Sequence, residues 1–183
     1  MKKSWFVKDV KETDVKKSPR APFITSTLQQ SASSRLGFAP SRTMGIAQKL
    51  YEAGHITYMR TDSTNLAASA IAQISEVVAK NFGKDLLQIR TYAAKSKNAQ
   101  EAHEAIRPTH FNLESAGIND EQKKLYQLIW NRTVSSQMAD AGTLRTKITA
   151  NVDGADTPNF SITGTQVKFP GWLLADPASR GDD

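Results

Sequence analysis

Apolar residues recur every three or four positions in much of the chain, which predicts a succession of helices. The first helix has Thr25 or Ser26 as its N-cap and ends near Gly37. The second runs from residue 41 to 53, where Gly54 provides a C-terminal stop. Both predicted helices therefore end at a glycine that starts a new segment.

Two further helices are predicted, from about residue 65 to 81 and from 119 to 138. Asn119 and Gln122 form a capping pair at the start of the fourth helix. The third helix has an apolar face made of Ile71, Ile74, Val78 and Phe82. The core candidates of the fourth helix are Leu125, Leu128, Ile129 and Trp130.

Strand-like segments flank this helical region. Residues 1–20 predict one strand followed by an extended segment, because nearby prolines disfavour helix. After Gly142 the period changes to two, and a Gly/Asp/Pro turn separates two strands. Their apolar positions are Leu144, Ile148 and Val152, then Phe160, Ile162, Val167 and Phe169. The sequence therefore predicts an α+β fold in which a mostly helical domain is inserted between β-strands.

The segment between the third and fourth helices gives weaker signals. Residues 84–100 predict an exposed connection, and residues 101–108 predict a short helical turn that Pro108 stops.

Composition limits the class of protein more than it identifies it. The chain has 183 residues, of which 39% are hydrophobic and 23% charged, so we expect one packed domain or a domain with an appendage. No apolar run approaches the roughly 20 residues that span a bilayer, and there is no cysteine for disulfides or thiol chemistry. We expect a cytoplasmic protein with no membrane partner.

The net charge of +6 suggests an acidic partner only weakly, because residues 1–20 carry +4 of it. Standard cofactor and metal motifs are missing from the sequence. It contains neither a phosphate-binding Gly-Lys-Ser/Thr loop nor a dinucleotide fingerprint. A zinc-protease helix is excluded because Arg107 stands where the second histidine would follow His103. We predict no metal ligand in this chain.

The segment around Tyr58 offers a different chemistry. In an extended backbone Tyr58, Arg60 and Asp62 would project to the same side. A phenol can attack a phosphodiester, and the resulting phosphotyrosine linkage retains enough energy to be resealed without ATP. Arg60 could hold the phosphate through its guanidinium fork. Tyrosines pack more often than they react, so residue types alone leave both interpretations open.

Three stretches of the chain resemble type IA DNA topoisomerases, in the same order. They are residues 21–30 (APFITSTLQQ), 48–65 (QKLYEAGHITYMRTDSTN) and 100–108 (QEAHEAIRP). Met59 between Tyr58 and Arg60 is similar to the bacterial topoisomerase I branch rather than to topoisomerase III, which usually has proline there.

The resemblance implies roles for individual residues. Tyr58 matches the tyrosine that forms a 5′-phosphotyrosyl bond with single-stranded DNA, and Arg60 matches the arginine beside the scissile phosphate. His103 matches a histidine that lines the same pocket, with a buried structural histidine as the alternative. Matches to supporting positions are Gln48, Glu52, Thr57, Thr61 and Asp62. For Gln48 and Glu52 an ordinary hydrogen bond on the helix surface is an equal alternative.

The resemblance covers this chain but only part of the family's enzyme. Residues 1–18 and 143–183 would belong to a hinge or arch, and 19–142 to the tyrosine-bearing domain. The Mg²⁺-binding domain would lie elsewhere, so no cofactor is expected here and the chain alone would not relax DNA. The implied partners are single-stranded DNA and the remaining domains of a nucleoid-associated enzyme, with a monomer favoured.

Two rival functions are weighed against this interpretation. The chain could be a non-catalytic module that binds single-stranded DNA or a protein partner. A tyrosine recombinase would require several separated Arg and His positions, and a replication-initiator nuclease would require a histidine cluster. Neither arrangement is visible in the sequence.

Overall fold

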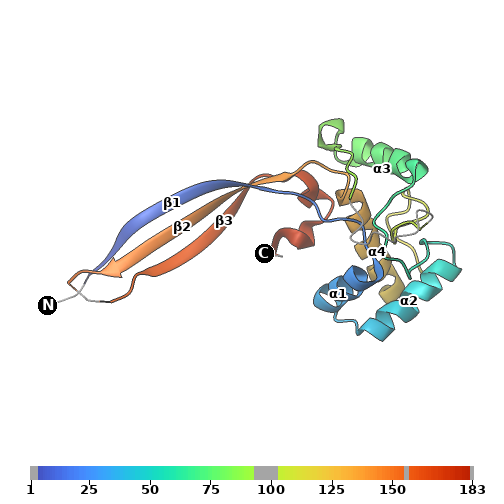
Figure 1. Cartoon of the computed structure of the whole chain (residues 1–183), viewed down its shortest axis with the longest axis horizontal. Coiled ribbons are helices and arrows are strands. Elements are labelled where there is room, and N and C mark those ends of the chain that lie inside the picture. Colours follow the sequence, from blue (N-terminus) through green and yellow to red (C-terminus); the bar gives the residue numbers. More distant parts are fainter. Residues whose placement is uncertain (1–3, 93–102, 155–156, 182–183) are drawn as a thin grey trace. The chain divides into compact units, whose positions relative to one another are not determined.

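The computed structural model describes residues 4–92, 103–154 and 157–181, with backbone only at residues 180 and 181. Within these ranges it contains four α-helices and one three-stranded antiparallel sheet, so the predicted α+β class is confirmed (Figure 1). Contacts divide the chain into two compact units. One holds residues 1–18 and 140–171, and the other holds residues 19–139 and the chain from Trp172 onward.

The second unit is helical. Its helices are α1 (Thr25–Leu36), α2 (Pro40–Glu52), α3 (Ala68–Asn81) and α4 (Asp120–Ser135). Helix α4 contacts each of the other three helices and has more buried residues than any of them, so it forms the centre of the unit. The fully buried side chains of this helix and of the segments around it include Phe23, Leu28, Leu50, Ile74, Leu125 and Ile129.

The four predicted helices are confirmed, with small changes at their ends. Helix α3 starts three residues later than expected, and α4 stops at Ser135 instead of Met138. The predicted cap of α4 is correct, because the Asn119 side-chain oxygen accepts a hydrogen bond from the backbone amide of Gln122 at 3.0 Å. The predicted cap of α1 is wrong. Ile24 occupies that position, and the Thr25 hydroxyl is used elsewhere.

Between α3 and α4 one prediction holds only in part and another is wrong. Residues 84–92 are not simply an exposed connection, because Leu86 is buried and Leu87 pairs with Met138 as an isolated β-bridge. Residues 103–108 are extended rather than helical, since Ile106 pairs with Phe23 and Pro108 with Ile56. The predictions for residues 93–102 lie outside the described residues.

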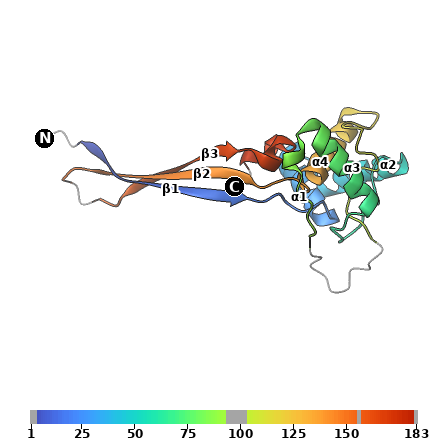
Figure 2. The same cartoon turned by 90° about the horizontal axis from the view of Figure 1, so that it is seen from above.

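The other unit is built on a sheet with strand order β1-β2-β3 (Figure 2). Its strands are β1 (Trp5–Lys17), β2 (Ala141–Val152) and β3 (Phe160–Phe169). The predicted strands are confirmed, and Ile148 lies opposite Val10 on one side and Ile162 on the other. This register places the three apolar residues on one face of the sheet.

The last residues belong to the helical unit, whereas the sequence grouped residues 143–183 with the strands. A short 3₁₀ segment, Gly171–Leu174, turns the chain so that Trp172 is only 2% exposed. The Trp172 amide donates to the Ala139 carbonyl at 2.9 Å. Burial of this large side chain explains why the segment groups with the helices.

Candidate active site

The Tyr58 segment is an irregular loop that follows α2. Gly54 ends that helix with a φ of +76°, a conformation that favours glycine. Beyond it, exposed and buried side chains alternate. The exposed residues are Tyr58, Arg60 and Asp62, and the buried residues are Met59, Thr61 and Ser63. The buried side chains anchor the backbone of the loop, and the three candidate functional side chains remain accessible to solvent.

One side of the loop is attached to the start of α1 through Thr25. The Thr25 hydroxyl donates to the Met59 carbonyl at 2.8 Å and accepts from the Thr61 amide at 3.0 Å. The Thr25 amide donates to the Thr61 carbonyl at 3.0 Å. These bonds fix the backbone on both sides of Arg60.

The other side of the loop is attached to the extended segment 103–108 through Thr57. The Thr57 amide donates to the Arg107 carbonyl at 2.9 Å. Its hydroxyl donates to the Ala105 carbonyl at 2.7 Å and accepts from the Arg107 amide at 2.9 Å. Tyr58 is therefore held between two segments that are distant in the sequence.

The Tyr58 side chain lines a cavity of about 360 Å³, which we name the Tyr58 hollow. Tyr51 lies in the same hollow, and the two rings make an edge-to-face contact with centroids 5.3 Å apart. Tyr58 is 47% exposed and Tyr51 is 40% exposed. The hollow is lined by Tyr51, Thr57, Tyr58, Thr61, His103 and Glu104.

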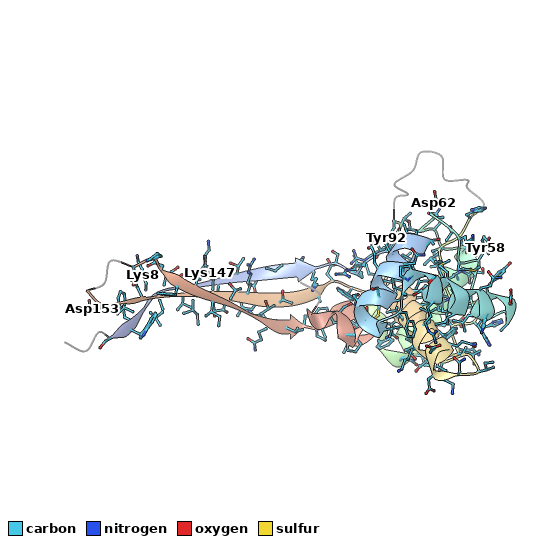
Figure 3. All side chains as sticks on the ribbon, turned by 90° about the horizontal axis from the view of Figure 1, so that it is seen from below. Lys8, Tyr58, Asp62, Tyr92, Lys147 and Asp153 are labelled. Carbon is cyan, nitrogen blue, oxygen red and sulfur yellow. The ribbon has the colours of Figure 1, made fainter. Side chains whose placement is uncertain are left out.

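Arg60 lines an adjoining cavity, which we name the Arg60 hollow, together with Asp62. Thr61 and His103 line both hollows, so they form the wall that the two share. Arg60 makes no ion pair with any residue in the described ranges. The His103 side chain therefore lines the same hollow as Tyr58, and the exposed Arg60 lines the hollow that adjoins it. The labelled side chains of Tyr58 and Asp62 belong to this region (Figure 3).

The structure separates Gln48 and Glu52 from these hollows. Their side chains bond to each other on α2, with 2.7 Å between the Gln48 amide nitrogen and the Glu52 carboxylate. Neither lines the Tyr58 hollow or the Arg60 hollow. The sequence left two interpretations of Gln48 and Glu52 open, a supporting role at the site or an ordinary hydrogen bond on the helix surface. The structure shows the hydrogen bond.

Three residues of the site were missed by sequence reasoning: Thr25, Tyr51 and Glu104. Glu104 accepts from the Ala67 amide at 2.7 Å and forms a 2.7 Å ion pair with Arg107. All three lie inside the stretches that carry the family resemblance, which was the available signal. The bonds of Thr25 and the Glu104 bond to Ala67 join segments that are distant in the sequence, so no local spacing identifies them. Tyr51 takes part through ring packing against Tyr58, seven residues further along the chain.

The described residues hold neither a metal-binding cluster nor a membrane-spanning helix. No group of three or more His, Asp or Glu side chains in these ranges could hold a metal ion. None of the helices in them is both long enough and apolar enough to cross a membrane.

A tyrosine, an arginine and a histidine thus line two adjoining hollows, and the comparisons with known proteins agree on one family. A family model described as DNA topoisomerase matches residues 1–183. The chain belongs to the DNA topoisomerase family. Among curated DNA topoisomerase 1 proteins, that of Streptomyces coelicolor is 48% identical over 192 residues, covering 97% of this chain. The Escherichia coli protein is 48% identical over 170 residues, covering 90% of this chain.

This topoisomerase chain also resembles a solved structure, the full-length topoisomerase I from Thermotoga maritima. The TM-score is 0.77 at 36% identity, and the match covers 93% of this chain and 29% of that one. The chain spans about a fifth of the length of the curated relatives, with 20% of the S. coelicolor protein and 19% of the E. coli protein matched. The similarity therefore concerns one part of a larger architecture.

Proposed function

We propose that this chain supplies the nucleophile of a bacterial type IA DNA topoisomerase and that the nucleophile is Tyr58. The observation that carries the proposal is the exposed Tyr58 phenol in a hollow that shares a wall with the Arg60 hollow. A guanidinium close to a nucleophile is suited to binding a phosphodiester, because it neutralises the phosphate and offers parallel N–H donors. Membership of the DNA topoisomerase family supports DNA as the source of that phosphate.

The proposed reaction is a transesterification. The Tyr58 oxygen forms a bond to phosphorus, and the bond from phosphorus to the 3′ oxygen of the preceding nucleotide breaks. The phenol loses one proton and the released 3′ oxygen gains one, so no net proton, electron or nucleotide is consumed. Resealing is the reverse step. Arg60 stabilises the charge that builds up on the phosphate oxygens during both steps.

His103 and Asp62 have supporting roles in this proposal. His103 lines both hollows, so its ring can contact a phosphate held between Tyr58 and Arg60. Asp62 lines the Arg60 hollow, where its carboxylate can orient the guanidinium. Thr57 and Thr61 act through the backbone, since their bonds fix the loop that carries Tyr58.

The described residues of this chain do not fit a magnesium site. Glu104, the acidic residue in the Tyr58 hollow, is already paired with Arg107, and no group of three ligands is present in these ranges. Mg²⁺ prefers several oxygen ligands in octahedral geometry. We therefore propose that the described residues of this chain do not hold the magnesium of the complete enzyme.

The activity of the complete protein follows from this proposal. Such an enzyme would cleave one DNA strand, pass another strand through the break and religate it, relaxing negative supercoils in the bacterial nucleoid. The helices lie between β1 and β2 in chain order, which is compatible with a tyrosine-bearing domain carried on β-strands that serve as a hinge.

A chimera tests the proposal. The segment of the E. coli relative that matches this chain is replaced by it, and relaxation of a negatively supercoiled plasmid is measured. We expect relaxation by the chimera and by its Tyr51→Phe variant, and none by its Tyr58→Phe variant. Tyr51 is the matched control because it lies in the same hollow with a similar exposed fraction. Relaxation that survives Tyr58→Phe contradicts the proposal. A chain that binds DNA while the chimera is inactive supports the non-catalytic alternative.

A further inference from the structure

The outward face of α1 is polar but carries no charge. Arg35 is the only charged residue of this helix, and its guanidinium is paired with Asp176 at 2.9 Å. The accessible face instead consists of serine and glutamine side chains at helical spacing. These residues are Ser26, Gln29, Gln30, Ser33 and Ser34.

This composition is unusual for an exposed helix face. Solvent-facing positions are normally stabilised by strong helix formers and by charged pairs four residues apart. Serine is a weaker helix former because its hydroxyl competes for backbone groups. Three exposed serines without a carboxylate or an ion pair are therefore unfavourable for helix stability. A binding role for this face would explain why they are present.

The same side chains line a third cavity, of about 450 Å³, which we name the α1 groove. It extends from Ser26 to Pro40, at the start of α2. Ser26 and Gln29 also line the Arg60 hollow, so the two cavities adjoin. A helix of this length spans about 18 Å. A continuous path therefore leads from Arg60 along α1.

The polar groups in the α1 groove are available for a ligand. Within the described ranges the side chains of Ser26, Gln29, Gln30 and Ser33 have no hydrogen-bond partner. Only the Ser34 hydroxyl is engaged, donating to the Ser31 carbonyl at 3.3 Å. Serine hydroxyls and glutamine amides are common donors to phosphate and sugar oxygens of nucleic acids.

We propose that the α1 groove binds the DNA strand on the 3′ side of the scissile phosphate. The inference rests on the proposed function of Tyr58. A strand joined to Tyr58 through its 5′ phosphate extends in the 3′ direction, and it must remain in register for religation. Neutral donors can bind such a strand, and none of the described residues that line this groove has a carboxylate to repel its phosphates. Binding through neutral donors does not release counterions from the DNA.

The test is a binding measurement on the 183-residue chain with Tyr58→Phe, which removes the proposed chemistry. Oligothymidylates of increasing length carry a 5′ phosphate and a 3′ fluorophore, and binding is followed by fluorescence anisotropy. We expect affinity to rise over the first few nucleotides and then to level off. Oligonucleotides of the same lengths with the phosphate at the 3′ end, and the fluorophore at the 5′ end, should not show this rise.

Two charge substitutions locate the bound strand. Gln30→Glu and Ser33→Glu place a carboxylate in the α1 groove, so each should weaken binding of the longer oligonucleotides about fivefold or more. Binding of the shortest ones should change little. Ser69→Glu is the matched control, since Ser69 is exposed on α3 and lines none of the three cavities. Equal circular-dichroism spectra verify that the variants are folded.

Three results would overturn the inference. They are an affinity independent of length, equal effects of the three glutamate variants, and no measurable binding of any oligonucleotide. None of them changes the chimera result, which depends on Tyr58 chemistry and reports on the proposed function separately. If Tyr58→Phe leaves the chimera active while the α1 groove binds DNA, the proposed function fails and the groove remains a nucleic-acid site.

Discussion

The Thr25 hydroxyl lies 2.8 Å from the carbonyl oxygen of Met59, the residue that follows Tyr58. The same hydroxyl accepts from the Thr61 amide, so one side chain at the start of α1 holds the loop on both sides of Arg60. The position of the proposed nucleophile therefore depends on a residue more than thirty positions earlier.

Thr25→Val should destabilise the helical unit and lower activity, because it removes the hydroxyl and leaves the Thr61 amide without this partner. The expected loss is about 1–3 kcal/mol in the free energy of unfolding. Thr25→Ser keeps the hydroxyl and is the control. Urea denaturation of the chain and plasmid relaxation by the chimera measure the two effects. Equal stability and activity of the valine and serine variants would show that these bonds are unimportant.

Arg60→Gln should lower the salt dependence of DNA binding. If Arg60 neutralises one phosphate, the slope of log K against log salt for single-stranded DNA falls in magnitude by about 0.7. Lys84→Gln removes an exposed positive charge that lines none of the three named cavities, and it should leave the slope unchanged. The same slope for wild type and Arg60→Gln would rule out a direct phosphate contact.

The raised pKa of Tyr126 predicts how the free energy of unfolding changes at alkaline pH. Burial raises its pKa from 10.0 to about 12, and its hydroxyl donates to the Leu113 carbonyl at 2.8 Å. Below pH 10 both the folded and unfolded states keep the proton, and this contribution to stability is complete. Between pH 10 and 12 only the unfolded state ionises, so the contribution falls by about 3 kcal/mol.

Tyr126→Phe isolates that contribution. The variant should be less stable than wild type at neutral pH because the Leu113 carbonyl loses its donor. Its unfolding free energy should fall less steeply between pH 10 and 12, so the two stability curves converge. Curves that stay parallel over this range contradict the assignment.

Trp172→Ala should destabilise the helical unit by about 3–5 kcal/mol, as expected for loss of a large buried side chain. The indole is 2% exposed and belongs to that unit. Leu174→Ala is the control, since Leu174 is 39% exposed and should cost much less. Thermal unfolding followed by circular dichroism gives the comparison. Similar losses in both variants would mean that Trp172 is not part of the core.

The sequence predicted the elements whose signals are local. Periodic apolar positions located all four helices and both later strands, and Asn119 correctly marked the start of α4. The errors fall where distant pairing decides the structure. Residues 103–108 are extended because Ile106 pairs with Phe23 and Pro108 with Ile56, and no local pattern encodes these partners.

The candidate site shows the same division. The exposure of Tyr58 and Arg60 agrees with the functional interpretation of their segment, and the structure places His103 between their two hollows. The ring contact with Tyr51 and the bonds from Thr25 could not be predicted, since both depend on tertiary packing. The catalytic role of Tyr58 itself stays a prediction.

That role can be tested most directly by locating the covalent bond. The chimera is mixed with single-stranded DNA, the reaction is stopped with denaturant, and the DNA-linked peptide is sequenced by mass spectrometry after nuclease and protease digestion. The account predicts a nucleotide attached through its 5′ phosphate to Tyr58 and to no other residue. Attachment to Tyr51, or an adduct that persists in Tyr58→Phe, would contradict it.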